Sequence, residues 1–178
     1  MYQIMIVDDE GNILNALQRI FRKQENWEVE TYSNVHDALK RAQVACFDLF
    51  LSDYRMPEMS GVDFLREVKN LQPEAMRLII SGYADLTALL GAINEAQIYR
   101  FISKPWQDYE LITTVTQALE HRDIQVENRR LADQLREQQR ELDKRKQILD
   151  KYNREHPDLF VVDWTIDGSI KLDGYDDK

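Results

Sequence analysis

Short apolar runs alternate with segments of helical periodicity over residues 1 to about 120. The apolar runs have the length of strands and lie at residues 2–7, 27–32, 47–52, 76–81 and 98–103. The segments between them carry apolar side chains at three- and four-residue spacing, and they cover residues 11–24, 34–44, 61–70 and 84–96, with a further helix beginning near Asp108. Five strand–helix units with short links predict an α/β fold, a doubly wound parallel sheet with helices on both faces.

The character of the chain changes after residue 121. Residues 124–152 contain no Gly or Pro, and apolar residues recur there in a 4,3 alternation that predicts a coiled coil continuous with the fifth helix, over residues 122–155. An Asn at a core position favours a parallel, in-register dimer, while Gln138 and Arg145 weaken the seam. A single solvated helix is the alternative. The predicted seam consists of Ile124, Asn128, Leu131, Leu135, Leu142 and Leu149.

Residues 156–178 form a third segment with the pattern of a β-hairpin. His156 and Pro157 end the helix, apolar side chains alternate from Phe160 onward, and an Asp167-Gly168 step marks a tight turn. Because one isolated hairpin is barely stable in water, we expect this tail to pack on another surface. It is either a cap that stabilises the dimer or a docking element for a downstream protein.

Composition narrows the class of protein. The 178 residues, 43% hydrophobic, suit one domain over residues 1–121 plus an extension, and a net charge of −9 argues against a nucleic-acid-binding face. The coiled-coil segment interleaves ten basic with eight acidic residues, which is not typical of a DNA-binding basic region. We expect the single cysteine, Cys46, to be buried. With no membrane span and no signal pattern, we expect a cytoplasmic protein with no membrane partner.

Polar residues follow four of the predicted strands. Asp8 and Asp9 end the first, Asp53 the third, Ser81 the fourth and Lys104 the fifth. The carboxyl ends of parallel strands converge on the ligand-binding edge of such a sheet. Close carboxylates repel unless a cation intervenes, so the group predicts a site for Mg²⁺ (or Mn²⁺) and a phosphoryl group. An aspartate in that setting can act as a nucleophile, and a lysine can neutralise the transferred group.

Four motifs in the same regions resemble the receiver domain of bacterial two-component response regulators. They are Val-Asp-Asp-Glu at 7–10, Ser-Asp-Tyr-Arg-Met-Pro-Glu-Met-Ser-Gly at 52–61, Ser-Gly at 81–82 and Phe-Ile-Ser-Lys-Pro-Trp at 101–106. They fall in the order and at the spacing of that family. The resemblance implies a flavodoxin-like (βα)5 sheet with strand order 2-1-3-4-5.

The resemblance also implies roles for the acidic site. Asp53 matches the phosphoacceptor, and Asp9 matches a direct Mg²⁺ ligand whose neighbour Asp8 binds through water. The backbone carbonyl of Arg55 matches the third protein ligand. Lys104 matches the lysine that pairs with the phosphoryl group, with a cis bond to the following proline.

Two further positions match the family's switch residues. Ser81 corresponds to the hydroxyl that moves toward the phosphoryl group, and Phe101 to the aromatic ring that follows it inward. A bulky Tyr83 beside Arg55 is a candidate for hindering the water that removes the phosphoryl group. Taken singly, each residue has a simpler interpretation: Asp8 and Asp9 as helix caps, Phe101 as core, and Pro57 and Gly61 as turn residues.

The function implied is a phosphorylation switch rather than an enzyme. Asp53 would accept a phosphoryl group from a histidine kinase or phosphotransfer protein and signal through a parallel homodimer and the tail to a protein partner. A phosphate sink or shuttle without a dedicated output is the alternative. A phosphatase of the aspartate-nucleophile class is disfavoured, because its nucleophile follows the first strand, whereas Asp53 follows the third.

Overall fold

The structure is a computed structural model that describes residues 1–82 and 96–155. The predicted helix over residues 84–96, apart from its last residue, and the predicted hairpin in residues 156–178 lie outside the described part of the chain, as does Tyr83. The elements in chain order are β1 (Tyr2–Val7), α1 (Gly11–Phe21), β2 (Trp27–Tyr32), α2 (Val35–Val44), β3 (Leu49–Asp53), α3 (Gly61–Leu71), β4 (Met76–Gly82), β5 (Arg100–Lys104) and α5 (Asp108–Glu155).

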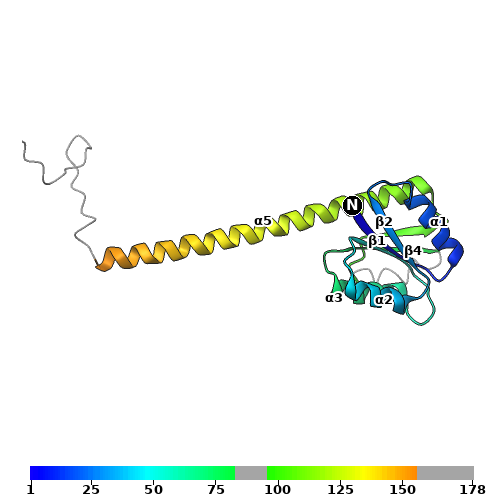
Figure 1. Cartoon of the computed structure of the whole chain (residues 1–178), viewed down its shortest axis with the longest axis horizontal. Coiled ribbons are helices and arrows are strands. Elements are labelled where there is room, and N and C mark those ends of the chain that lie inside the picture. Colours follow the sequence, from blue (N-terminus) through cyan, green and yellow to red (C-terminus); the bar gives the residue numbers. More distant parts are fainter. Residues whose placement is uncertain (83–95, 156–178) are drawn as a thin grey trace, which may run out of the picture. The chain divides into compact units, whose positions relative to one another are not determined.

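The five strands form one parallel sheet in the order β2-β1-β3-β4-β5 (Figure 1). This is the predicted flavodoxin-like order, in which the chain reverses its direction of travel across the sheet between β1 and β3. Every residue of β3 is buried, and so are six of the seven residues of β4. The continuous apolar runs at these strands therefore reflect burial on both faces.

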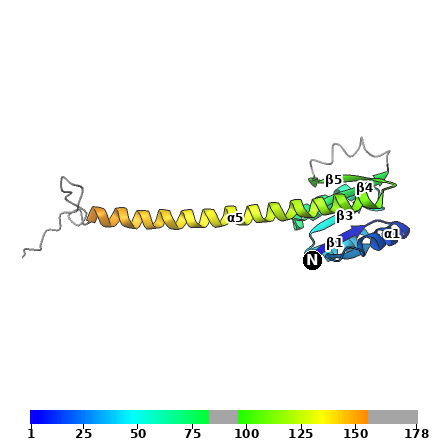
Figure 2. The same ribbon diagram turned by 90° about the horizontal axis from the view of Figure 1, so that it is seen from above.

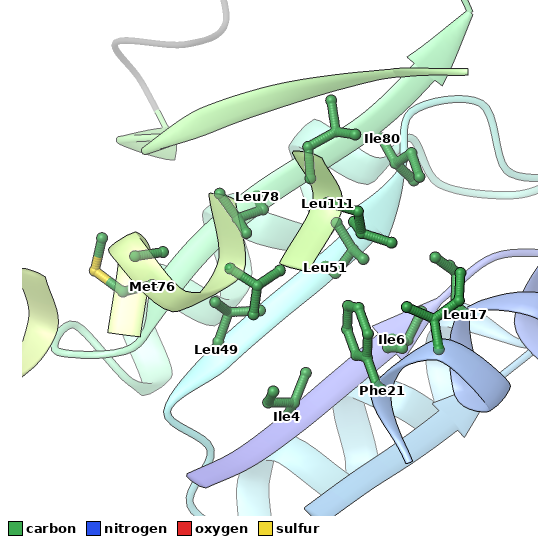
Figure 3. Packing of buried hydrophobic residues seen from close by; sticks show 14 of the residues in the cluster. Ile4, Ile6, Leu17, Phe21, Leu49, Leu51, Met76, Leu78, Ile80 and Leu111 are labelled. Atoms are coloured by element: carbon green, nitrogen blue, oxygen red, sulfur yellow. The ribbon is translucent and has the colours of Figure 1, made fainter. Parts of the chain in front are cut away.

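Two apolar clusters cover the two faces of the sheet. Successive strand residues point to opposite faces, so Ile4 and Leu49 enter one cluster while Met5 and Phe50 enter the other. The first cluster joins the sheet to α1 and α5, as the packing of Phe21 and its neighbours in Figure 3 shows. The second cluster joins it to α2 and α3, which lie on the other side of the strands from the start of α5 in Figure 1, so that helices lie on both faces. Figure 2 shows α1 and α5 beside the strands.

Arg77 is a buried cation in β4. Its guanidinium donates hydrogen bonds to the main-chain carbonyls of Ala75 (2.6 Å), Ala96 (2.9 Å) and Pro73 (3.4 Å). Burial lowers the pKa of the Arg77 guanidinium, but an arginine keeps its proton in proteins. These bonds attach the segment that leads into β5 to the segment that leads into β4.

The chain divides into two compact units, Met1–Asn128 and Arg129–Lys178. The first holds the sheet with its covering helices. The described part of the second is helical to Glu155, and large apolar side chains lie exposed along it: Leu131, Leu135, Leu142, Ile148, Leu149 and Tyr152. No helix in the two described stretches is both long enough and apolar enough to span a membrane.

One burial prediction was wrong. Cys46 is exposed, because it lies in the connection between α2 and β3 rather than in the strand. Phe47 next to it is buried and contributes to the second apolar cluster. The predicted strand over residues 47–52 begins two residues later, at Leu49.

Candidate functional site

The carboxyl edge of the sheet gathers the polar residues that follow its strands. Asp53 is the last residue of β3, Lys104 is the last residue of β5, and Asp8 follows β1 directly. Because all five strands are parallel, these positions lie at one edge. Asp8, Asp53 and Ser81 are almost completely buried, although each carries a polar side chain.

Lys104 brings two of the carboxylates together. Its Nζ lies 2.5 Å from Oδ1 of Asp53 and 2.8 Å from Oδ2 of Asp8. The side chains of Asp53 and Asp8 are only 9% and 1% exposed, and that of Lys104 is 19% exposed. A third carboxylate, Glu10 Oε1, lies 3.8 Å from the same nitrogen but is largely exposed. The buried part of this cluster thus has two anionic groups and one cation.

The charges in this cluster perturb one another. Burial raises the pKa of the Asp8 carboxyl above its ordinary value, although hydrogen bonds from Lys104 and from the Glu10 N–H oppose the rise. Burial also disfavours the charged form of Lys104, but its hydrogen bonds to Asp53 and Asp8 outweigh that effect and raise the pKa of the ammonium group. Lys104 is therefore held in its charged form between the two carboxyl groups.

Main-chain groups hold the remaining carboxylate oxygens. The N–H of Arg55 donates to Oδ2 of Asp53 at 2.6 Å, and the N–H of Glu10 donates to Oδ1 of Asp8 at 2.9 Å. In each case the donor lies two residues after the acid, which is a short turn favoured by aspartate. Both carboxylates are thereby oriented from two sides. Asp8 consequently does not cap α1 with its side chain, and Glu10 at the N-cap position makes no side-chain capping bond.

The other predicted site residues differ in their surroundings. Ser81 pairs with Ser103 in the β4–β5 register, one residue beyond Ile80, which pairs with Asp53. Phe101 is partly buried against the apolar cluster that α2 and α3 cover. Asp9 is exposed, and no hydrogen bond or ion pair in the described stretches joins it to Asp53. The Lys104–Pro105 bond is cis, as the family resemblance implied.

The carboxylates of the cluster determine whether a hard cation can bind there. Within residues 1–82 and 96–155 there is no group of three or more His, Cys, Asp or Glu side chains placed to hold a metal ion. Mg²⁺, however, keeps several waters and needs only one or two carboxylates beside phosphate oxygens. The buried pair Asp8 and Asp53, with an excess of negative charge over Lys104, fits that requirement.

Two contacts of Asp53 were not predicted from the sequence. The buried hydroxyl of Ser52 donates to the main-chain carbonyl of Asp53 at 2.9 Å, and Gly61 packs against the same carbonyl. Gly61 is the first residue of α3, and the absence of a β-carbon there permits this close approach, so Gly61 is more than a turn residue. Ser52 gave no sequence signal beyond its place next to Asp53.

The fold and the polar cluster at the carboxyl edge of the sheet can now be compared with known proteins, and the comparison gives the family. The family model described as response regulator receiver domain matches residues 4–116, so the chain belongs to the response regulator receiver family of two-component signalling. A hydrogenase transcriptional regulatory protein, HoxA of Bradyrhizobium diazoefficiens, is 41% identical over 124 residues, which are 70% of this chain and 25% of that protein.

Other relatives match a larger share of their own length. The response regulator protein TmoT of Ectopseudomonas mendocina is 33% identical over 150 residues, 84% of this chain and 67% of that protein. The solved signal receiver domain of an HD domain-containing protein from Pseudomonas fluorescens Pf-5 is 32% identical, with a TM-score of 0.67 over 71% of this chain and 92% of that one. The chain thus spans about a quarter of HoxA and about two thirds of TmoT.

Proposed function

We propose that this protein is a phosphorylation switch in which Asp53 accepts a phosphoryl group from a histidine kinase or a phosphotransfer protein. The observation that supports this most directly is the contact of Lys104 with Asp53 at 2.5 Å and with Asp8 at 2.8 Å. A lysine so placed can neutralise oxygens of an incoming phosphoryl group beside the nucleophile.

The transfer requires an in-line displacement at phosphorus. A carboxylate oxygen of Asp53 forms the new bond to phosphorus while the bond from phosphorus to the donor's imidazole nitrogen breaks, and the electron pair leaves with that nitrogen. The Arg55 N–H and Lys104 hold the carboxylate of Asp53 in place for the attack. As the new bond forms, the ammonium of Lys104 is released from its pair with Asp53 and turns to an oxygen of the phosphoryl group.

A divalent cation completes this proposal. Asp8, Asp9, Asp53 and the main-chain carbonyl of Arg55 are the residues we assign to holding Mg²⁺ (or Mn²⁺). When bound, the cation supplies positive charge that offsets the negative charge of the phosphoryl oxygens. The buried excess of carboxylate charge over the single Lys104 ammonium supports this assignment.

The output of the switch is assigned to the β4–β5 region and to α5. We propose that Ser81 turns toward the phosphoryl group and that Phe101 fills the space it leaves. Ser81 is buried next to the end of β3, and Phe101 pairs with Ile79 in the β4–β5 register. Repacking there changes the surface that precedes α5, and packed interfaces of this kind respond in discrete steps.

We further propose that a second copy of the chain covers the exposed apolar stripe of α5, as a parallel coiled coil. The leucines at seven-residue spacing remain 53–66% exposed in one chain: Leu135, Leu142 and Leu149. In a parallel dimer, Glu141 of one helix faces Lys146 of the other, which gives the two copies complementary charge. Residues 122–155 would then be the dimerisation segment, with residues 156–178 presented to a downstream partner.

A phosphate sink or shuttle remains the second candidate, because it needs the same site and no output. Deletion of residues 157–178 separates the two functions. A sink continues to drain phosphoryl groups from its kinase, whereas an effector loses its downstream response.

The central proposal is tested by phosphorylation with acetyl phosphate and Mg²⁺. We expect Asp53→Asn to abolish incorporation of the phosphoryl group, because the amide is not a nucleophile at phosphorus. Asp37→Asn, an exposed aspartate on α2, is the matched control and should label like the wild type. Equal labelling of the wild type and Asp53→Asn contradicts the proposal.

A further inference from the structure

Gly61 lies against the main chain of Asp53. A β-carbon at Gly61 would overlap the carbonyl oxygen of Asp53, and it would also lie 2.9 Å from the carbonyl carbon of Asp53 and 2.9 Å from Oγ of Ser52. Backbone atoms cannot turn aside as the end of a long side chain can. Any residue other than glycine at position 61 therefore requires the Asp53 peptide or the start of α3 to move.

Hydrogen bonds close the loop that joins β3 to α3 around this contact. The N–H of Gly61 donates to the carbonyl of Tyr54 at 2.9 Å, and the hydroxyl of Ser52 donates to the carbonyl of Asp53 at 2.9 Å. Ser60 caps α3 by accepting from the N–H of Asp63 at 3.2 Å. The start of α3 is thus attached to Tyr54, which follows Asp53, while Ser52 on the other side holds the carbonyl of Asp53.

The side-chain carboxylate of Asp53 is also held tightly, so the residue can move little. Its carboxylate is held by the Arg55 N–H at 2.6 Å and by Lys104 at 2.5 Å, and its side chain is nearly buried. A displacement on the order of 1 Å at a reacting group can cost up to a hundredfold in rate. A shift of the main chain at Asp53 changes the direction of the carboxylate relative to both donors.

We propose that Gly61 and the Ser52 hydroxyl are positioning residues for Asp53: they fix the main chain of the phosphoacceptor so that its carboxylate meets Lys104 and the Arg55 N–H. This inference rests on the proposed function of Asp53 as the phosphoacceptor. Neither residue touches the transferred group; both act through the peptide of Asp53.

The chain provides two controls for a substitution at Gly61. Gly11 is the first residue of α1 and follows the acidic pair at the end of β1, but a β-carbon there meets nothing within 4 Å. Gly11→Ala thus tests the same chemical change beside the same site without the contact. Val62 is buried in the second apolar cluster next to Gly61, so Val62→Ala lowers stability without adding an atom near Asp53.

The experiment measures the rate of phosphorylation by acetyl phosphate at saturating donor and Mg²⁺. It uses the full chain at a temperature well below the unfolding midpoint of each variant, with folding checked by circular dichroism. We expect Gly61→Ala to lose at least about tenfold in rate. Ser52→Ala should lose on the order of threefold, because one hydrogen bond to the Asp53 carbonyl is removed. Gly11→Ala and Val62→Ala should label at the wild-type rate.

Each outcome decides the question. A folded Gly61→Ala variant that labels as fast as Val62→Ala shows that the close contact serves stability alone, and the inference is then wrong. If Gly61→Ala does not fold, Ser52→Ala decides, and a wild-type rate in that variant overturns the inference. Labelling of Asp53→Asn in the same assay would instead reject the proposed function, so the two failures are distinguishable.

Discussion

Arg122 of α5 and Asp48 form an ion pair with 2.8 Å between Nη2 and Oδ1. The other oxygen of Asp48 accepts the N–H of Gln3 at 2.7 Å, so one carboxylate connects the fifth helix to the start of β1. Next to it, the Tyr2 hydroxyl donates to Asp123 at 2.6 Å. These contacts attach α5 to the amino-terminal edge of the sheet, opposite the site around Asp53.

This ion pair should contribute measurably to stability. The side chains of Arg122 and Asp48 are 21% and 19% exposed, so water screens them only partly. A double-mutant cycle of Arg122→Met and Asp48→Asn should give a coupling energy of roughly 1 kcal/mol or more in urea denaturation. The exposed pair Arg66 and Asp63 is the control and should couple by less than about 0.5 kcal/mol. Equal couplings in the two pairs would contradict this expectation.

Removal of Lys104 should separate catalysis from cation binding. In Lys104→Met the ammonium no longer neutralises the phosphoryl oxygens, so the rate of labelling by acetyl phosphate should fall roughly a hundredfold. The same change removes the ammonium group that pairs with both Asp8 and Asp53, so their carboxylates are free to bind Mg²⁺. The rise in unfolding temperature on addition of Mg²⁺ should therefore be at least as large as in the wild type. A smaller rise would mean that Lys104 supports the cation site instead of competing for its carboxylates.

Glu30 gives a pH-dependent contribution to stability with a defined sign. Hydrogen bonds from Arg41 lower the pKa of the Glu30 carboxyl below its ordinary value of 4.5. The stabilisation is therefore fully present above pH 4.5 and is lost as the pH falls through the lowered pKa of the folded state. Denaturation of the wild type and Glu30→Gln should differ most near neutral pH, and the difference should close in acid. Arg41→Met should show the same pH dependence, because it removes the same interaction.

The apolar stripe of α5 predicts a concentration-dependent dimer. Leu135→Asn places a further amide in the proposed seam, beside those of Asn128 and Gln138, and should shift sedimentation of the full chain toward the monomer. Arg140 occupies an outward position in the same register, so Arg140→Asn carries a similar loss of helix propensity without touching the seam. A monomeric wild type at high micromolar concentration would reject the second copy as the partner of this helix.

Replacing a polar residue in the proposed seam by an apolar one should strengthen the dimer. Arg145, at a proposed core position, is 75% exposed in the single chain, where its guanidinium lies 3.8 Å from the carboxylate of Glu141 on the same helix. Arg145→Leu should therefore strengthen the dimer, by roughly tenfold or more in the dissociation constant. The same leucine at the outward Arg140 position should leave the dissociation constant unchanged. Equal effects at both positions would place the seam on another face of the helix.

Most of the fold could be predicted from the sequence, because burial determines where apolar residues fall both in the strands and in the helices. The run Leu49-Phe50-Leu51 has no polar residue and becomes a strand covered on both faces, whereas α1 shows the spacing of a helix buried along one side. The ends of the helices were predicted less accurately: the helix predicted over residues 11–24 ends at Phe21. Residues at a helix end lose few contacts when they leave it, so periodicity alone does not locate the last turn.

The site was predicted in its residue types but not in its contacts. Strand ends placed Asp8, Asp53 and Lys104 at one edge, yet nothing in the spacing indicated that one ammonium group joins both carboxylates. Contacts made by main-chain atoms were hidden altogether, because they depend on the path of the loop and not on side-chain chemistry. The approach of Gly61 to the Asp53 carbonyl is of this kind. The exposure of Cys46 was also not predicted, because it depends on β3 beginning at Leu49 and not next to the cysteine.

The guanidinium of Arg77 donates hydrogen bonds to the main-chain carbonyls of residues 73, 75 and 96. Every amino acid offers the same carbonyl, so these bonds constrain the course of the chain there without constraining which residues occupy those positions. Substitutions at the three acceptor positions should therefore leave these hydrogen bonds possible, whereas replacement of the arginine should remove them. A lysine, with one ammonium in place of a planar fork, cannot reach acceptors spread so far apart.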